Sequence, residues 1–549
     1  MRRLFVQAVD PSESIQSPFK GSIQSLNTVF RHGGTIKFPF IIESKELYLN
    51  PSSTLLKLFF IAEHTMPEGF EGFSLTCKRI QEVAERFREK HNQLKRRYRN
   101  FQYNWPAQEY YNAFTNQFLE DGGAANLIYS PLHLIQRISE EPRIARYITS
   151  AKLAERGTHA VFEVRCRFID RVRSTLTLLP LLQSSPYIKD ASLDPLDFYE
   201  VLLSEYVTGS EAKLSIAFLL ALLPNLINVQ LDLGGRHLPH NHPSAEPRRK
   251  QLLDVVIDRA NDPSYPTAAL SKLNTLVATK NRATGTVHHL TTAEVEPYLT
   301  IKSLRRYVLT TKPDVPPSCD FNCTTWFPSN RLSNERTTEG LETFAVMGFD
   351  TTVPELRYML GQFPRLKTLK FCYSMSGPGP AGGLETIEIL SETLEELHFL
   401  DFNAENIGDD FVQSMHSFKK LKCLRLDFDS VFDRLKIIDH GLPKITQFLP
   451  HTLEKLVLVM NELFTDLHTL WSFLYEVHSG SEDGVRVLPK LENITILTEH
   501  TTETAQEGFE RLSDIYKQSY NTLENCDRIQ IIHTGLGRQE LRLEAMENW

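Results

Sequence analysis

The chain has 549 residues and a mass of 63.0 kDa, well above the ~250–300 residues at which a single hydrophobic core stops growing. Hydrophobic residues make up 41% of the sequence and charged residues 23%. This balance is typical of folded proteins and excludes the collagen-like and disordered classes. The formal net charge of −8 gives no general attraction to polyphosphate, so nucleic acid is not an expected partner.

Cysteine usage and hydropathy indicate the compartment. The 7 cysteines form an odd set without regular spacing, which favours a reducing compartment over a disulfide framework. The longest apolar run, residues 216–223, is far shorter than the ~20 residues of a membrane span. The opening sequence MRRLFVQAVD lacks the apolar region of a signal peptide. We therefore expect a cytoplasmic or nuclear protein without membrane contact.

The first predicted elements are helical and follow an N-terminal segment, residues 1–50, whose fold we do not predict. Apolar or weakly polar residues recur at alternating steps of three and four from Phe70 to Phe101, which predicts one continuous helical face. A short apolar segment from Leu55 to Ala62 predicts a second helix packed against it. Residues 51–103 are therefore expected to form a small all-α module.

The opposite face of the long predicted helix is basic. This pattern is usual for a solvated face, but it would also suit contacts with RNA or DNA phosphates. The mean spacing of the apolar face is compatible with a coiled coil as well. The basic residues are Lys78, Arg79, Arg86, Arg88, Lys90, Lys95, Arg96, Arg97 and Arg99.

Residues 104–142 show no sustained period and are predicted to be a linker or irregular packing layer. From residue 143 to 549 an internal repeat follows, an apolar residue and then L-x-x-L-x-L. Four segments keep this pattern well: 363–371, 418–426, 449–458 and 488–496. Five weaker copies lie at 223–231, 270–278, 301–309, 340–346 and 390–399.

One repeat has a direct physical interpretation. In FPRLKTLKF, Leu369 and Phe371 are two residues apart and point to the same side of a short strand, while Leu366 turns inward at its start. Stacked copies would form a parallel sheet with a continuous apolar core, covered outside by helices such as Val353–Phe363. We predict an α/β fold, an irregular leucine-rich-repeat solenoid with a C-terminal cap. The alternative is that the pattern marks buried strands of an unrelated α/β domain.

Two stretches carry a family resemblance. EGFEGFSLTCKRIQEVAERFREKHNQLKRRYRNF (Glu68–Phe101) is similar to the second half of a divergent F-box, although the Leu-Pro that opens an F-box is absent before Leu55. SPLHLIQRISEEPRIARYITSAKL (Ser130–Leu153) is similar to the segment that leads such chains into a first strand, expected here within Arg146–Leu153. With the repeats, they resemble the F-box and leucine-rich-repeat proteins that are numerous in filamentous fungi.

The resemblance implies a receptor without catalytic residues, cofactor or metal. In the family, the F-box binds the Skp adaptor of a cullin ubiquitin ligase, and the repeats hold the protein to be modified. Seven apolar residues of the predicted module would contact the adaptor or pack in the module's own core. They are Leu55, Leu56, Leu58, Phe59, Phe70, Phe73 and Leu75.

Two other functions stay open. One is a repeat scaffold for protein interactions whose F-box has decayed, with no ligase role. The other is an enzyme built from loops at one end of the repeats, although no nucleophile, phosphate-loop or metalloprotease motif occurs. The histidines of the loop segment HLPHNH (residues 237–242) could bind zinc, but no second ligand group accompanies them. Cys319 and Cys323 form a lone C-x-x-x-C, which predicts ordinary thiols.

Overall fold

The computed structural model divides the chain into two compact units. Unit 1 comprises Met1–Gln230 and His237–Asn274, and unit 2 comprises Leu231–Arg236 and Thr275–Trp549. The boundary passes through strand β5 (Asn228–Gly234), which contributes to both. The structure describes residues 5–6, 40–41, 58–59, 61–63, 65–75, 78–103, 128, 130–153, 172–173, 177–208, 213–234, 245–280, 297–311, 338–349, 353–373, 387–400, 415–427, 449–460, 488–498 and 529–533.

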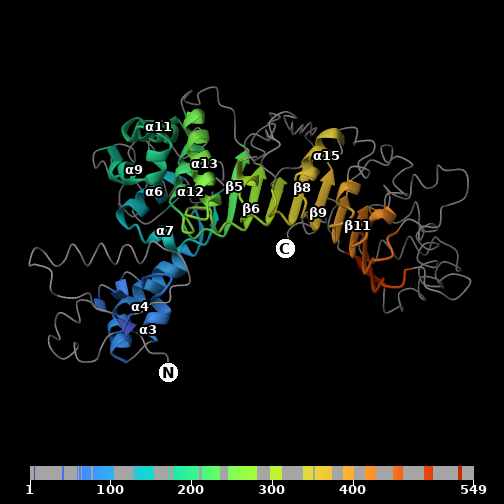
Figure 1. Ribbon diagram of the computed structural model, residues 1–549, viewed down its shortest axis with the longest axis horizontal. Helices are drawn as coiled ribbons and strands as arrows, with labels where there is room; N and C mark the ends of the chain where they lie inside the picture. The colour runs from blue at the N-terminus through green and yellow to red at the C-terminus, as the bar shows by residue number, and fades with distance from the viewer. Residues whose placement is uncertain are drawn as a thin grey trace, which may run out of the picture. The chain divides into compact units, whose positions relative to one another are not determined.

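Unit 1 contains most of the described helices (Figure 1). In chain order they are α3 (Phe70–Ser74), α4 (Lys78–Tyr98), α6 (Pro131–Glu140), α7 (Ile144–Tyr147), α9 (Leu179–Ser184), α10 (Pro186–Asp190), α11 (Pro195–Thr208), α12 (Lys213–Ala221) and α13 (Ala245–Asn261). Residues 58–59 and 61–63 are also helical, as the apolar segment there predicts. Near the N-terminus, β1 (Phe5–Val6) and β2 (Phe40–Ile41) form an antiparallel pair.

The prediction of one continuous helical face from Phe70 to Phe101 is wrong at both ends. The helix is interrupted between α3 and α4, and the chain after α4 enters strand β3 (Asn100–Gln102). Phe101 continues the helical spacing in sequence, but it is the buried middle residue of an exposed–buried–exposed strand. Within α4 the predicted face is correct, because Ile80, Ala84 and Tyr98 are buried.

Parallel pairing begins inside the predicted helical module. Strand β3 pairs with β4 (Ser150–Lys152), with Phe101 opposite Ala151, and β4 pairs with β5. The first repeat strand, expected within 146–153, is therefore the second strand of this sheet.

Part of the predicted linker 104–142 forms α6, which buries most of its apolar residues. The domain boundaries at 50, 103 and 142 stay predictions.

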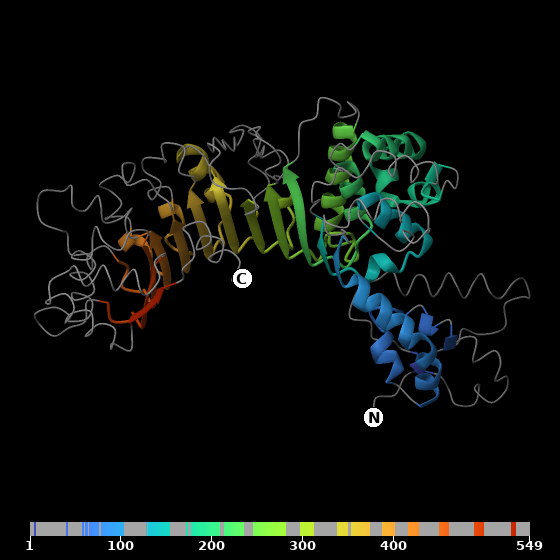
Figure 2. The same ribbon diagram turned by 180° about the vertical axis from the view of Figure 1, so that it is seen from behind.

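Unit 2 is built from parallel strands that follow one another in sequence (Figures 1 and 2). They are β6 (Thr275–Lys280), β7 (Arg306–Thr311), β8 (Thr343–Phe349), β9 (Thr368–Tyr373), β10 (Glu396–Leu400), β11 (Cys423–Asp427), β12 (Lys455–Met460), β13 (Asn493–Thr498) and β14 (Ile529–His533). The predicted helix after β8 is confirmed as α15 (Val353–Gly361), and the 3-10 turns η4 (Glu388–Leu390) and η6 (Met415–Ser417) precede β10 and β11. The α/β class with an open parallel sheet and outer helices is confirmed.

Each of the nine sequence repeats ends in one strand, β5 to β13. Register aligns their inward side chains, so that Leu369 lies opposite Leu397, and Leu397 lies opposite Leu424. All three are fully buried. The leading leucine of every repeat is buried as well, at positions 226, 273, 304, 341, 366, 394, 421, 453 and 491. Within unit 2, the inward residues of β6 to β13 form a continuous apolar ladder.

A row of charged residues, each half-exposed or exposed, lies where the strands begin. The residue after each leading leucine alternates in sign from β7 to β12: Arg305, Glu342, Lys367, Glu395, Lys422 and Glu454. The Lys367 ammonium lies 3.0 Å from the Glu342 carboxylate, and both side chains are about half exposed. Exposed pairs of this kind add little stability. They do keep like charges from lying side by side on adjacent strands, which favours this register.

We predict that Tyr307→Phe stabilises the protein. The Tyr307 ring is buried and stacked on Phe344 at 5.6 Å, and its hydroxyl has no hydrogen-bond partner in the described part of the chain. Removal of a buried, unsatisfied polar group should raise the free energy of unfolding by about 1 kcal/mol in denaturant titrations. The matched control is Tyr199→Phe, which removes a 3.1 Å hydrogen bond to the Val172 carbonyl and should lower it. A Tyr307→Phe protein less stable than wild type would contradict this account.

Gly340→Ala should destabilise unit 2. A methyl group at Gly340 would lie 2.5 Å from the Lys302 carbonyl oxygen and would also meet the Arg305 guanidinium. Because backbone must shift to relieve that clash, we expect a loss of ~1–3 kcal/mol in thermal or chemical unfolding. Gly72→Ala is the control, since among the described residues no atom beyond its chain neighbours and its own helix backbone lies within 4 Å of the added methyl group. That change in α3 should leave stability equal or slightly higher.

Candidate functional site

The seven residues predicted for adaptor contact occupy different environments. Leu58, Phe70 and Phe73 are buried in the helical module, and Phe59 is half-buried. Leu75, directly after α3, is 84% exposed. Leu55 and Leu56 lie outside the described residues. Of the five that are described, Leu75 is therefore the side chain most available to a partner.

Phe59 packs against the long helix of the module. Its ring lies 5.8 Å from the Phe87 ring in an edge-on arrangement, and the Arg86 guanidinium lies 5.1 Å from its centre. An arginine over an aromatic face is attracted by the ring quadrupole. Phe59 thus ties the first helical segment to α4, and part of the basic face of α4 serves that contact.

The helical module is joined to α7 through a buried histidine. The His91 ring of α4 packs against the Phe70 ring in a tilted arrangement with centres 4.7 Å apart, and its Nδ1 lies 2.9 Å from the Tyr147 hydroxyl. Burial and the Lys95 charge lower the pKa of His91, which favours the neutral imidazole at this junction. The three rings, from α3, α4 and α7, hold the module against the helices that follow it.

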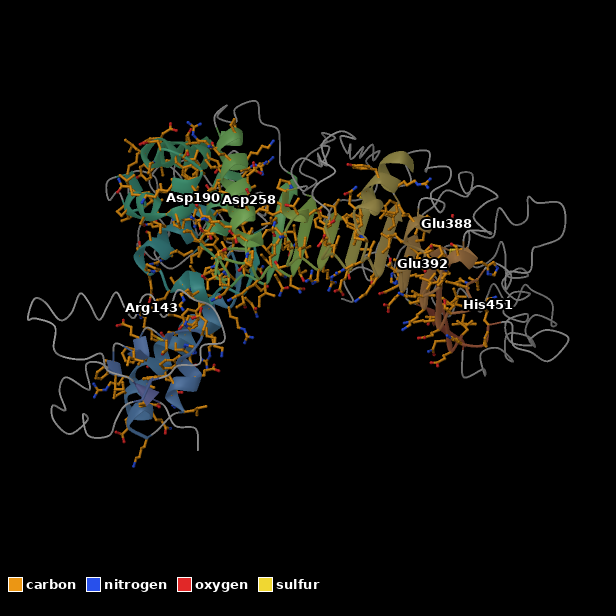
Figure 3. All side chains as sticks on the ribbon, in the orientation of Figure 1. Arg143, Asp190, Asp258, Glu388, Glu392 and His451 are labelled. Carbon is orange, nitrogen blue, oxygen red and sulfur yellow. The ribbon has the colours of Figure 1, made fainter. Side chains whose placement is uncertain are left out.

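Ion pairs surround this junction. Arg146 of α7 forms two hydrogen bonds to the Glu68 carboxylate, at 2.6 and 3.2 Å. The Asn225 amide donates to Glu68 and to the Arg146 carbonyl, and Lys272 donates to the Asn225 side-chain oxygen at 2.7 Å. A further ion pair joins Arg143 (Figure 3) to Glu63. The module is therefore fixed at several points to the rest of unit 1.

A shallow basic hollow lies at the C-terminal end of α4. It has a volume of about 360 Å³ and a largely polar lining. The residues around it are Asn92, Lys95, Arg96, Arg99 and Asn100. Lys95 is paired with Glu71, so part of this charge is already neutralised within the module. A wide, open hollow of this kind suits a weak ionic contact better than a catalytic site.

A second group of polar residues lies on the outward side of unit 2, opposite the apolar ladder. We call it the charged cluster. Two rows cross three strands in register, because side chains alternate along each strand and pair across strands. The first row is Thr368, Glu396 and Cys423, and the second is Lys370, His398 and Arg425. The second-row residues are only 7%, 9% and 9% exposed, respectively.

Glu396 is the centre of the charged cluster. Its Oε1 lies 2.8 Å from His398 Nε2 and 3.2 Å from the Lys370 ammonium. Thr368 donates to its Oε2 at 3.3 Å. The His398 Nδ1 has no hydrogen-bond partner in the described part of the chain, although the residue is more than nine-tenths buried. With the Nε2 proton donated to Glu396, Nδ1 carries a lone pair, and this atom is itself buried.

These contacts set the charges of the cluster. Burial, with the Lys370 and Arg425 charges, outweighs the Glu396 hydrogen bond and lowers the pKa of His398 to about 4. Burial alone would raise the pKa of Glu396, but the contacts with His398 and Lys370 lower it to about 2. Near neutral pH the cluster thus holds the Glu396 carboxylate and the neutral His398 imidazole beside the basic side chains of Lys370 and Arg425.

The cluster fits a cation poorly. Glu396, His398 and Cys423 each offer one ligand atom within 4.8 Å of the others, and these are ligand types that zinc uses. However, a structural zinc site needs four ligands, and the Lys370 ammonium already contacts the same carboxylate. Burial and the Glu396 charge also raise the pKa of Cys423 to about 11, which keeps its thiol protonated. The surrounding positive charge favours an anionic group instead.

The sequence contained a signal for this cluster that our motif search missed. Three successive repeats place a basic or imidazole residue between the last two apolar positions, in LKF, LHF and LRL. Alternation sends that position to the outward face. The motifs that were singled out, the HLPHNH histidines, Cys319 and Cys323, lie outside the described residues.

No family model matches the chain. None of the curated proteins matches it either. Among the described residues, the structure contains no helix with both the length and the apolar character needed to cross a membrane.

We predict that acid destabilises the protein partly through the charged cluster. The unfolded His398 imidazole takes up a proton below pH ~6.5, whereas the folded one resists protonation down to about pH 4, so stability falls across that interval as pH falls. Glu396 continues the loss from about pH 4.5 to about pH 2. The measurement is the thermal unfolding midpoint as a function of pH. His398→Gln should make this curve flatter than that of wild type between pH 6.5 and 4, and the two curves should be parallel above pH 7.5. Identical profiles for both proteins would contradict the assignment.

Proposed function

We propose that this protein is a non-catalytic receptor, similar to F-box and leucine-rich-repeat proteins. In this role, the outward face of the sheet binds a target protein, and the helical module binds a Skp-type adaptor of a cullin ubiquitin ligase. The observation that carries the proposal is the set of nine sequence repeats, each ending in one strand of a parallel series. Repeats of this kind bury one row of residues and leave another for recognition.

The burial pattern supports the leucine-rich-repeat interpretation. Inward positions are apolar from β6 to β13, as in Leu276, Phe344 and Ile494, and all of these are buried. Outward positions instead vary in charge and size between strands, as Ala345, Lys370 and Val457 illustrate. Variation confined to the outward face is what a protein-binding surface requires, because it changes specificity without changing the core.

The helical module supports the adaptor role at one place. Leu75 is a large apolar side chain exposed at the end of α3, in the segment that resembles an F-box. An exposed leucine of this kind is a suitable anchor for a helical partner. Leu58, Phe70 and Phe73 contribute by holding the module together.

The junction in unit 1 supports a receptor that positions what it binds. The His91–Tyr147 contact and the Glu68–Arg146 ion pair fix the module to α7. Because a ligase must hold its target at a defined distance from the modifying enzyme, a rigid link next to the adaptor site would serve that function.

A repeat scaffold with a decayed F-box is the second candidate. It is favoured by the missing Leu-Pro before Leu55 and by the burial of Leu58, Phe70 and Phe73, which leaves few apolar residues for an adaptor. The two candidates make opposite predictions for adaptor binding.

The test is direct binding of the full chain to a purified Skp-type adaptor. Wild type should bind the adaptor. Leu75→Asp should raise the dissociation constant at least tenfold, because a charge replaces the apolar anchor. Leu196→Asp is the matched control, since Leu196 of α11 is also an exposed leucine, at 56%, but lies outside the module. No binding by wild type, or equal loss in both variants, would overturn the adaptor role and leave the scaffold.

A further inference from the structure

Cations recur along the outward face of unit 2. Arg306 of β7, Lys370 of β9, Arg425 of β11 and Lys455 of β12 all occupy outward positions. Over the two described rows from β7 to β12, the only acidic residue is Glu396. Over these two rows of described residues, cations therefore outnumber acidic residues, in a chain whose formal net charge is −8.

From this arrangement we infer that the outward face of β7 to β12 binds an extended, acidic segment of a partner protein. The inference rests on the proposed target-binding role of the sheet and specifies the chemistry of the target. Carboxylates of the segment would approach Lys370 and Arg425, which lie in the same row on either side of His398. Charge complementarity of this kind selects the partner and speeds its association.

The spacing of the cations suits a chain that crosses the strands. Neighbouring strands are ~4.8 Å apart, so Lys370 and Arg425 are about 10 Å apart at the backbone, and the face from β7 to β12 extends over about 24 Å. An extended peptide rises ~3.3 Å per residue, so about seven residues would span this face with an acidic residue near every third position. A compact anion such as free phosphate would contact only part of it.

His398 is a neutral side chain between the two cations of this row. It lies on the strand between those of Lys370 and Arg425, and its Nδ1 is buried without a hydrogen-bond partner in the described part of the chain. The imidazole therefore separates the two positive charges without adding a charge of its own, which favours carboxylates spaced along the segment over one compact anion.

Glu396 limits the positive charge of the face. It contacts both Lys370 and His398, and so offsets one cation and fixes the orientation of the imidazole. Removal of its charge should therefore strengthen the binding of an acidic segment, whereas removal of the cations should weaken it. Variants with opposite expected effects separate a binding role from simple loss of folding.

The test uses the purified full chain without adaptor and a fluorescent decapeptide that has Glu at every third position and Ser between, and binding is measured by fluorescence anisotropy at ~50 mM salt. Wild type should bind this peptide and not the matching Lys–Ser peptide, and affinity should fall as salt screens the charges. The double variant Lys370→Met with Arg425→Gln should bind at least tenfold more weakly, and Glu396→Gln more tightly. The control, Lys420→Gln with Lys490→Gln, removes two exposed charges outside these rows and should bind like wild type.

Three results would overturn the inference: no preference for the acidic peptide, equal weakening in the control, or no gain with Glu396→Gln. Because adaptor is absent from this assay, failure here would leave the adaptor role standing. Conversely, a chain that binds the acidic peptide but no adaptor would support the scaffold with an acidic partner.

Discussion

The rest of the structure depends on the burial of inward leucines between successive parallel strands. A strand of five or six residues such as β10 or β9 cannot bury its apolar side alone, so each needs the next repeat to cover it. Leu369, Leu397 and Leu424 meet this requirement in register. The leading leucines are 25 to 47 residues apart in sequence. This irregularity is tolerated because the short L-x-x-L-x-L unit has to match its neighbours, while the residues between units do not.

The proposed function depends on the outward side chains of the strands, which the apolar ladder does not use. Because inward positions are committed to the core, the outward positions of the same strands can hold polar groups at little cost to packing. The charged cluster shows how such groups stabilise one another: Glu396 offsets Lys370, and its hydrogen bond orients the His398 ring. A largely buried set of this kind is more strictly positioned than exposed charges, which makes it suitable for recognition.

The two proposed binding roles use different parts of the chain and different kinds of interaction. Adaptor contact would use one exposed apolar anchor, Leu75, on a module whose other large residues form its own core. Target contact would use charge and shape on the sheet. His91, Tyr147 and Arg146 connect the module to the helices that follow it, so that unit 1 presents the anchor from a fixed base.

The sequence by itself determined the strands, the inward face and the α/β class, because period-two alternation with buried leucines is a local property that each repeat carries. It also determined the buried face of α4, through helical spacing. It could not show that Phe101 leaves that helix for a strand, since the helical spacing continues and only pairing with Ala151 decides the outcome. Nor could the sequence show that the side chains of Glu396, His398 and Cys423 lie close together, because they come from two different repeats. Their proximity exists only once register places neighbouring strands side by side.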